Sequence, residues 1–144
     1  MASAYPATRY QPPPPVDLTG KAERGRLSPS AIKAFFNIMA RWKVRDEDAR
    51  ALLGGVSNGP FYEMKKKSAG RLLDSDRLWR ISYLIGIFKA LRGTYSPKLA
   101  DAWVQLPNAN RIFGGQTPLA FMIKGGVPAM QTVRRLLDAR RGGM

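Results

Sequence analysis

The sequence predicts an all-α fold. Three pairs of a hydroxyl residue followed by proline, Ser28-Pro29, Ser96-Pro97 and Thr117-Pro118, have the pattern of an N-cap with proline at the first helical position. Glycines follow the expected helix ends, and no stretch alternates apolar and polar residues as a half-buried strand does. We expect helices near residues 29–42, 46–53, 58–67, 75–92, 97–104, 117–124 and 128–141.

Residues 1–26 are predicted to be a flexible, disordered Pro-rich leader ahead of domains at 27–93 and 94–144. The run Pro12–Pro15 favours polyproline II, which has no internal hydrogen bonds, and apolar residues are sparse. A Pro-rich docking motif is the alternative interpretation. The segment lacks the apolar stretch of a signal peptide, and no apolar run approaches the ~20 residues of a membrane span. We expect no membrane association and a cytoplasmic protein.

Composition argues against an enzyme and for a charged partner. The chain has no Cys and no His, which excludes disulfides, zinc sites of the Cys/His kind and His-dependent nucleophiles. We predict no catalytic residue, metal or cofactor; Asp101 and Asp138, the only acids after residue 93, have no motif-level partner. The formal net charge of +14 is typical of a nucleic-acid binder, although an acidic protein partner would also account for it.

The helix at 75–92 is apolar around most of its circumference. One stripe holds Leu78, Ile81, Ile85 and Phe88, and a second holds Trp79, Tyr83, Ile87 and Leu91. Such a helix is central in a bundle or shared between two chains. We expect the first stripe in the core, and the second either under the C-terminal helices or in a dimer seam.

Residues 46–67 have the pattern of a helix-turn-helix. Three acids, at positions 46–48, begin the first helix, Gly54 or Gly55 permits the turn, and Ser57 caps the second helix. Its first residues would meet base edges and the lysines would meet phosphates. An αα-hairpin with a solvated lysine face is the alternative. The candidate DNA-binding residues are Ser57, Asn58, Phe61, Tyr62, Lys65, Lys66 and Lys67.

The last 45 residues form a motif-rich mini-domain of short helices. The ordered set is Ala102-Trp103, Leu106-Pro107-Asn108, Ile112-Phe113-Gly114-Gly115, Thr117-Pro118-Leu119, Gly125-Gly126 and Leu136–Arg140. This arrangement resembles the toxin-binding domain of the Xre/MbcA/ParS family of antitoxins. The helix-turn-helix ahead of it is similar to the family's Xre-like N-terminal half.

The resemblance implies a non-enzymatic antitoxin of a bacterial type II toxin–antitoxin module. Its partner would be a RES-domain toxin, an NAD-consuming enzyme whose pocket the antitoxin's C-terminal region obstructs. The helix-turn-helix would bind and repress the module's promoter, and the antitoxin would be a homodimer within a toxin–antitoxin hetero-oligomer. The candidate toxin-binding residues are Trp103, Phe113, Arg134, Arg140, Arg141, Gly142, Gly143 and Met144.

Two alternatives stay open at this point. The arginines between 134 and 141 could form an ordinary solvated face of a terminal helix. The whole chain could instead be a stand-alone DNA-binding transcriptional regulator without a toxin, since the net charge and the lysine run require none.

Overall fold

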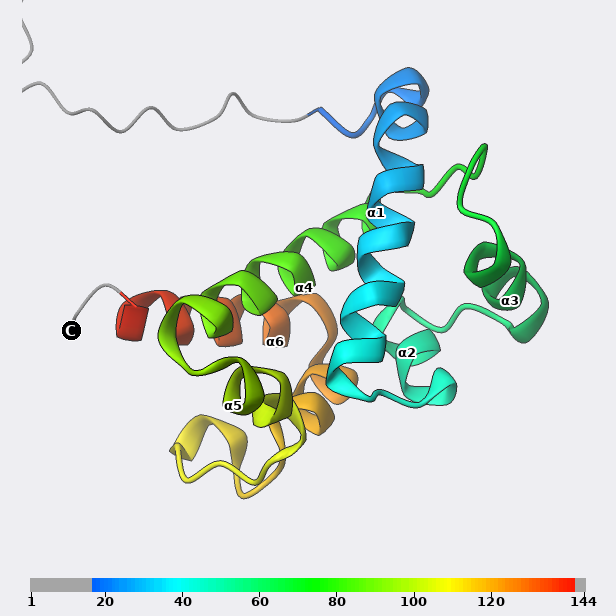
Figure 1. Cartoon of the computed structure of the whole chain (residues 1–144). Helices are drawn as coiled ribbons and strands as arrows, with labels where there is room; N and C mark the ends of the chain where they lie inside the picture. The colour runs from blue at the N-terminus through cyan, green and yellow to red at the C-terminus, as the bar shows by residue number, and fades with distance from the viewer. Residues whose placement is uncertain (1–16, 142–144) are drawn as a thin grey trace, which may run out of the picture.

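The computed structural model describes residues 17–141, and every regular element in that range is a helix, which confirms the all-α prediction (Figure 1). The elements are α1 (Lys21–Trp42), α2 (Asp46–Leu52), α3 (Asn58–Lys66), α4 (Ser75–Thr94), α5 (Pro97–Ala102), the 3-10 turns η1 (Trp103–Gln105) and η2 (Arg111–Phe113), and α6 (Pro118–Arg141).

Helix α1 begins at Lys21 rather than at the predicted Pro29, which lies inside it. Ser28 is fully buried instead of capping the helix: its hydroxyl donates to the Arg24 carbonyl (2.6 Å) and accepts from the Leu73 N–H (2.9 Å). The prediction was wrong because a Ser-Pro pair looks the same at a helix start and beside a buried loop. Of the expected leader, residues 1–16 lie outside the described range.

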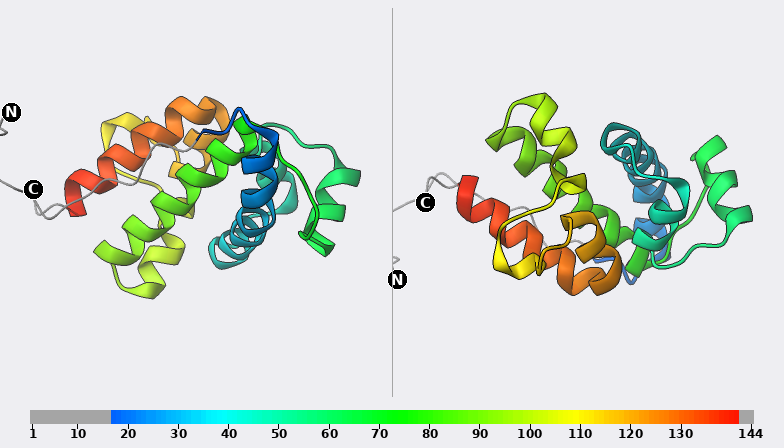
Figure 2. Two further views of the ribbon diagram at one scale, coloured as in Figure 1. Left: turned by 90° about the horizontal axis from the view of Figure 1, so that it is seen from above. Right: turned by 90° about the horizontal axis from the view of Figure 1, so that it is seen from below.

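Helix α4 is the centre of the fold and packs most extensively on α6, then on α1 (Figures 1 and 2). In the first stripe, Leu78 and Ile81 are buried, as predicted, whereas Ile85 and Phe88 are only half-buried. In the second, Ile87 and Leu91 are buried, while Trp79 remains 43% exposed. One apolar core runs from α1 through α4 into α6, across the predicted domain boundary near residue 93.

The two helices predicted at 117–124 and 128–141 are the arms of α6, which bends at Gly126 (φ 63°, ψ −144°). Thr117 caps the first arm, since its hydroxyl accepts from the Ala120 N–H at 3.1 Å. The second arm runs alongside α4 in the same direction. The Gln131 side chain donates to the Tyr83 hydroxyl (2.9 Å), and the Arg134 guanidinium lies over Gly86.

Candidate functional site

The segment α2–turn–α3 has the predicted helix-turn-helix order. Gly54 (φ 90°) and Gly55 (φ 91°) both adopt positive φ, which most side chains resist. Helix α3 begins at Asn58, so Pro60 falls in its first turn, where a missing N–H costs no intrahelical hydrogen bond. The local signals therefore gave the correct helix boundaries within about one residue.

Helix α3 turns one face to the core and one to solvent. Phe61 is fully buried and packs edge-on against Phe36 of α1 (5.2 Å between ring centroids), and Met64 lies on the same inner face. The assignment of Phe61 to DNA contact is therefore corrected, because helical periodicity makes it an anchor of α3. The other candidates are exposed: Ser57, Asn58, Tyr62, Lys65, Lys66 and Lys67.

A carboxylate of α2 holds part of this exposed face. Asp46 accepts from the Lys65 ammonium (2.9 Å) and from the Tyr62 hydroxyl (3.1 Å). The hydrogen bond from Lys65, with a smaller one from Tyr62, keeps the pKa of Asp46 below its ordinary value. The Lys65–Asp46 pair is exposed and worth at most about 1 kcal/mol. Lys65 can therefore exchange Asp46 for another anionic partner at little cost.

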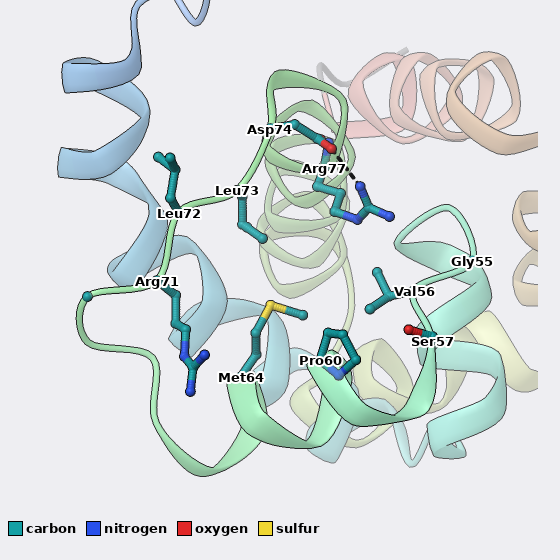
Figure 3. Close-up of a pocket in the computed structure, with 11 residues that line it drawn as sticks. Gly55, Val56, Ser57, Pro60, Met64, Arg71, Leu72, Leu73, Asp74 and Arg77 are labelled. Carbon is teal, nitrogen blue, oxygen red and sulfur yellow. Dashed lines mark hydrogen bonds and ion pairs between the residues drawn. The ribbon is translucent and has the colours of Figure 1, made fainter.

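A cleft of about 580 Å³ separates α3 from the segment that leads into α4 (Figure 3). Ser57, Pro60 and Met64 line one side, and residues 70–74 with Arg77 line the other. The Arg77 guanidinium donates a hydrogen bond to the Asp74 carboxylate (2.5 Å), so its charge is already paired with an acid. The described residues contain no cluster of acidic side chains that could hold a metal ion.

Two of the basic candidates of α6, Arg134 and Arg140, are half-buried and exposed respectively, and each has a hydrogen-bond partner. Arg134 donates to the Asp138 carboxylate (3.0 Å) from the turn before it. Arg140 is exposed and donates to the hydroxyl of Tyr95 (3.0 Å). Arg141 ends α6, and the predicted contacts at residues 142–144 lie outside the described range.

The assignment of Trp103 and Phe113 to toxin contact is corrected, because both are core residues. Phe113 is fully buried and Trp103 is 6% exposed; their rings meet edge-on with centroids 6.0 Å apart. Phe113 continues the cluster to Phe121 (5.2 Å). The aromatic motif thus builds the mini-domain, because turns as short as η1 and η2 need large side chains to bury enough apolar surface.

Three exposed apolar residues close in sequence to Trp103 and Phe113 are not among the predicted toxin contacts. Leu99, Leu106 and Ile112 expose 41%, 43% and 39% of their surface. Leu99 precedes Trp103 by four residues, Leu106 follows it by three, and Ile112 adjoins Phe113. Large exposed apolar residues are candidates for a protein interaction site. The motif itself contains Leu106 and Ile112, but only tertiary structure tells which of its members face outward.

Comparisons with known proteins agree with the C-terminal motif. Residues 93–143 match the family model of the antitoxin Xre/MbcA/ParS C-terminal toxin-binding domain. The chain is similar to the uncharacterized protein y4oB of Sinorhizobium fredii (strain NBRC 101917 / NGR234), with 38% identity over 116 residues, covering 80% of this chain and 87% of that protein. No solved structure matches the chain. No helix among residues 17–141 is long and apolar enough to cross a membrane.

Proposed function

Because this chain belongs to the Xre/MbcA/ParS family of antitoxins, we propose that it neutralises a RES-domain, NAD-consuming toxin by covering the toxin's active site with the end of α6 and the residues after it. The observation that carries the proposal is the match of residues 93–143 to the toxin-binding domain. The RES subtype and the blocking tail rest on the resemblance of the C-terminal motif.

The apolar side chains Leu99, Leu106 and Ile112 supply a docking area, and the arginines of α6 supply charge. Guanidinium groups form directed, charge-assisted hydrogen bonds with carboxylates and phosphates. Arg140 is oriented by the neutral Tyr95 hydroxyl rather than by an acid. Its charge is therefore available to an acidic group in a toxin pocket.

The proposed toxin contact leaves the helix-turn-helix accessible. The end of α6 and helix α3 lie at opposite ends of the molecule (Figures 1 and 2). A toxin held at α6 would not cover Asn58, Tyr62 or the lysines of α3. We therefore include autorepression in the proposal, with a homodimer placing two α3 helices on a palindromic promoter.

The neutralising role is tested by deleting residues 139–144 and co-expressing the variant with the toxin. We expect cellular NAD to fall and growth to stop, while circular dichroism and DNA binding stay unchanged, because Ala139 and Arg140, whose side chains the structure describes, are both exposed. Arg26→Ala, which removes an exposed cation of α1, is the matched control and should protect cells fully. Full protection by the truncated chain would exclude the tail-blocking mechanism.

A stand-alone DNA-binding regulator is the second candidate, favoured by the exposed Lys65, Lys66 and Lys67. The antitoxin and the stand-alone regulator both predict DNA binding. Fluorescence anisotropy of a labelled promoter fragment measures it, and the affinity should fall as the salt concentration rises. The two are distinguished by copurification with the product of the neighbouring reading frame. A stable complex with a RES-domain protein supports the antitoxin. Repression of the promoter by a chain that copurifies with no such partner supports the regulator.

A further inference from the structure

An apolar groove runs between α1 and α4, away from the proposed DNA and toxin contacts. Its volume is about 580 Å³, and it joins a second hollow of about 540 Å³ through the shared residues Ala34, Ile85 and Lys89. The principal lining residues are Leu27, Ala31 and Ala34 of α1 and Leu78, Trp79 and Ile85 of α4.

The groove has a shallow floor and one aromatic wall. Ala31 and Ala34 are too small to fill the space between the two helices. Trp79 is 43% exposed, whereas Trp42 and Trp103 are 1% and 6% exposed. An indole beside a narrow apolar channel is the kind of surface on which proline rings of a polyproline II segment pack.

The chain enters the described structure at this groove. Leu18 is buried and contributes to the groove lining. The Arg24 guanidinium donates to the carbonyls of Leu18 (3.1 Å) and Thr19 (2.8 Å), which fixes where the preceding residues begin. The described chain therefore begins beside the groove, two residues after the run Pro12–Pro15 in the sequence.

The lengths agree. From Leu27 to Arg41, the part of α1 that borders both hollows, the helix rises about 21 Å at ~1.5 Å per residue. The seven residues from Tyr10 to Val16 span about 22 Å in polyproline II at ~3.1 Å per residue. The proline-rich run directly before Asp17 is thus as long as the surface it adjoins.

We infer that residues 10–16 dock in the α1–α4 groove of their own chain and cover Trp79. Proline has no backbone N–H and so needs no acceptor from the groove, and its restricted φ reduces the entropy lost on docking. A short tether gives an effective concentration in the millimolar range, so a weak contact is enough. The docked segment would keep this apolar face from other chains, including a second copy.

Quenching of tryptophan fluorescence by acrylamide tests the inference in the full chain. Trp79 dominates the quenchable signal because the other two tryptophans are buried. Replacing Pro12–Pro15 by Gly-Ser-Gly-Ser should raise the quenching constant severalfold, whereas Pro6→Ser, outside the docking span, should leave it unchanged. In Trp79→Phe the difference between the two leaders should disappear.

Equal quenching of the unaltered chain and the Gly-Ser variant would overturn the inference. Protection of Trp79 that persists in the Gly-Ser variant and is lost on dilution would also overturn it and assign the groove to a second copy. Docking in cis predicts protection that is independent of protein concentration. None of these outcomes depends on a toxin or on DNA, so they stand apart from the test of the proposed function.

Discussion

The guanidinium of Arg134 in α6 lies directly over Gly86 in α4, in the space that a side chain at position 86 would occupy. The ion pair with Asp138 (3.0 Å) holds the guanidinium in this orientation. One missing Cβ thus sets both the closeness of the two central helices and the position of a candidate toxin-contacting arginine.

Gly86→Leu should destabilise the fold by about 1–3 kcal/mol, because a large side chain in a filled interface forces its neighbours to shift. The measurement is urea unfolding followed by circular dichroism. In the double variant with Arg134→Ala, part of the loss should be recovered, since the overlapping group is removed. Strict additivity of the two substitutions would show that Arg134 and position 86 do not interact.

Asp46→Asn should strengthen DNA binding if α3 contacts phosphates. The substitution removes a negative charge from the exposed face and frees the Lys65 ammonium. A gain of about one phosphate contact would steepen the slope of log affinity against log salt by roughly 0.9. Glu23→Gln, which removes an equal charge paired with Arg26 on α1, is the control and should not change the slope. Unchanged binding in both variants would place the DNA contact elsewhere.

Stability should decline at acid pH and be nearly flat around neutrality. The pKa of Asp46 is lowered in the folded state, chiefly by Lys65, so its stabilisation is present above the unfolded value near 3.8 and is lost as pH falls through the folded value. The chain has no His, so no side chain with an ordinary pKa titrates between about pH 5 and 8. Urea unfolding over a pH series tests the expected loss of stability in acid and the flat stability around neutrality. The Asp46→Asn variant should lose less stability in acid than the unaltered chain.

Ser28→Ala should cost about 1–3 kcal/mol, because the buried Leu73 N–H loses its acceptor and cannot reach water. Ser30→Ala, an exposed change two residues away, should have little effect. The free energies of unfolding of the two variants give the comparison. Equal values would mean that the link between α1 and the loop before α4 adds nothing.

Leu106→Asp should abolish or strongly weaken toxin binding without unfolding the chain, since the side chain is 43% exposed. Trp103→Ala should instead destabilise the fold by about 3–5 kcal/mol, as expected for a buried aromatic. Calorimetry with purified toxin, beside thermal unfolding, separates the two effects. Normal toxin affinity of Leu106→Asp would remove Leu106 from the proposed interface.

Local signals in the sequence determined the helical class, most helix boundaries and the family. Proline after Thr117 and the glycines at 54 and 55 act through backbone geometry, which depends only on neighbours in the chain. The ordered motif from Trp103 to Gly126 was enough to predict the domain that residues 93–143 match.

Only the tertiary structure decided which side chains face outward. Ser28 became a buried link because Leu73, 45 residues away, needs an acceptor, and Phe61 became an anchor because Phe36 lies beneath it. Trp103 and Phe113 bury each other, which leaves Leu99, Leu106 and Ile112 at the surface. Burial is the sum of contacts between distant segments, and neither spacing nor residue type in one segment contains that information.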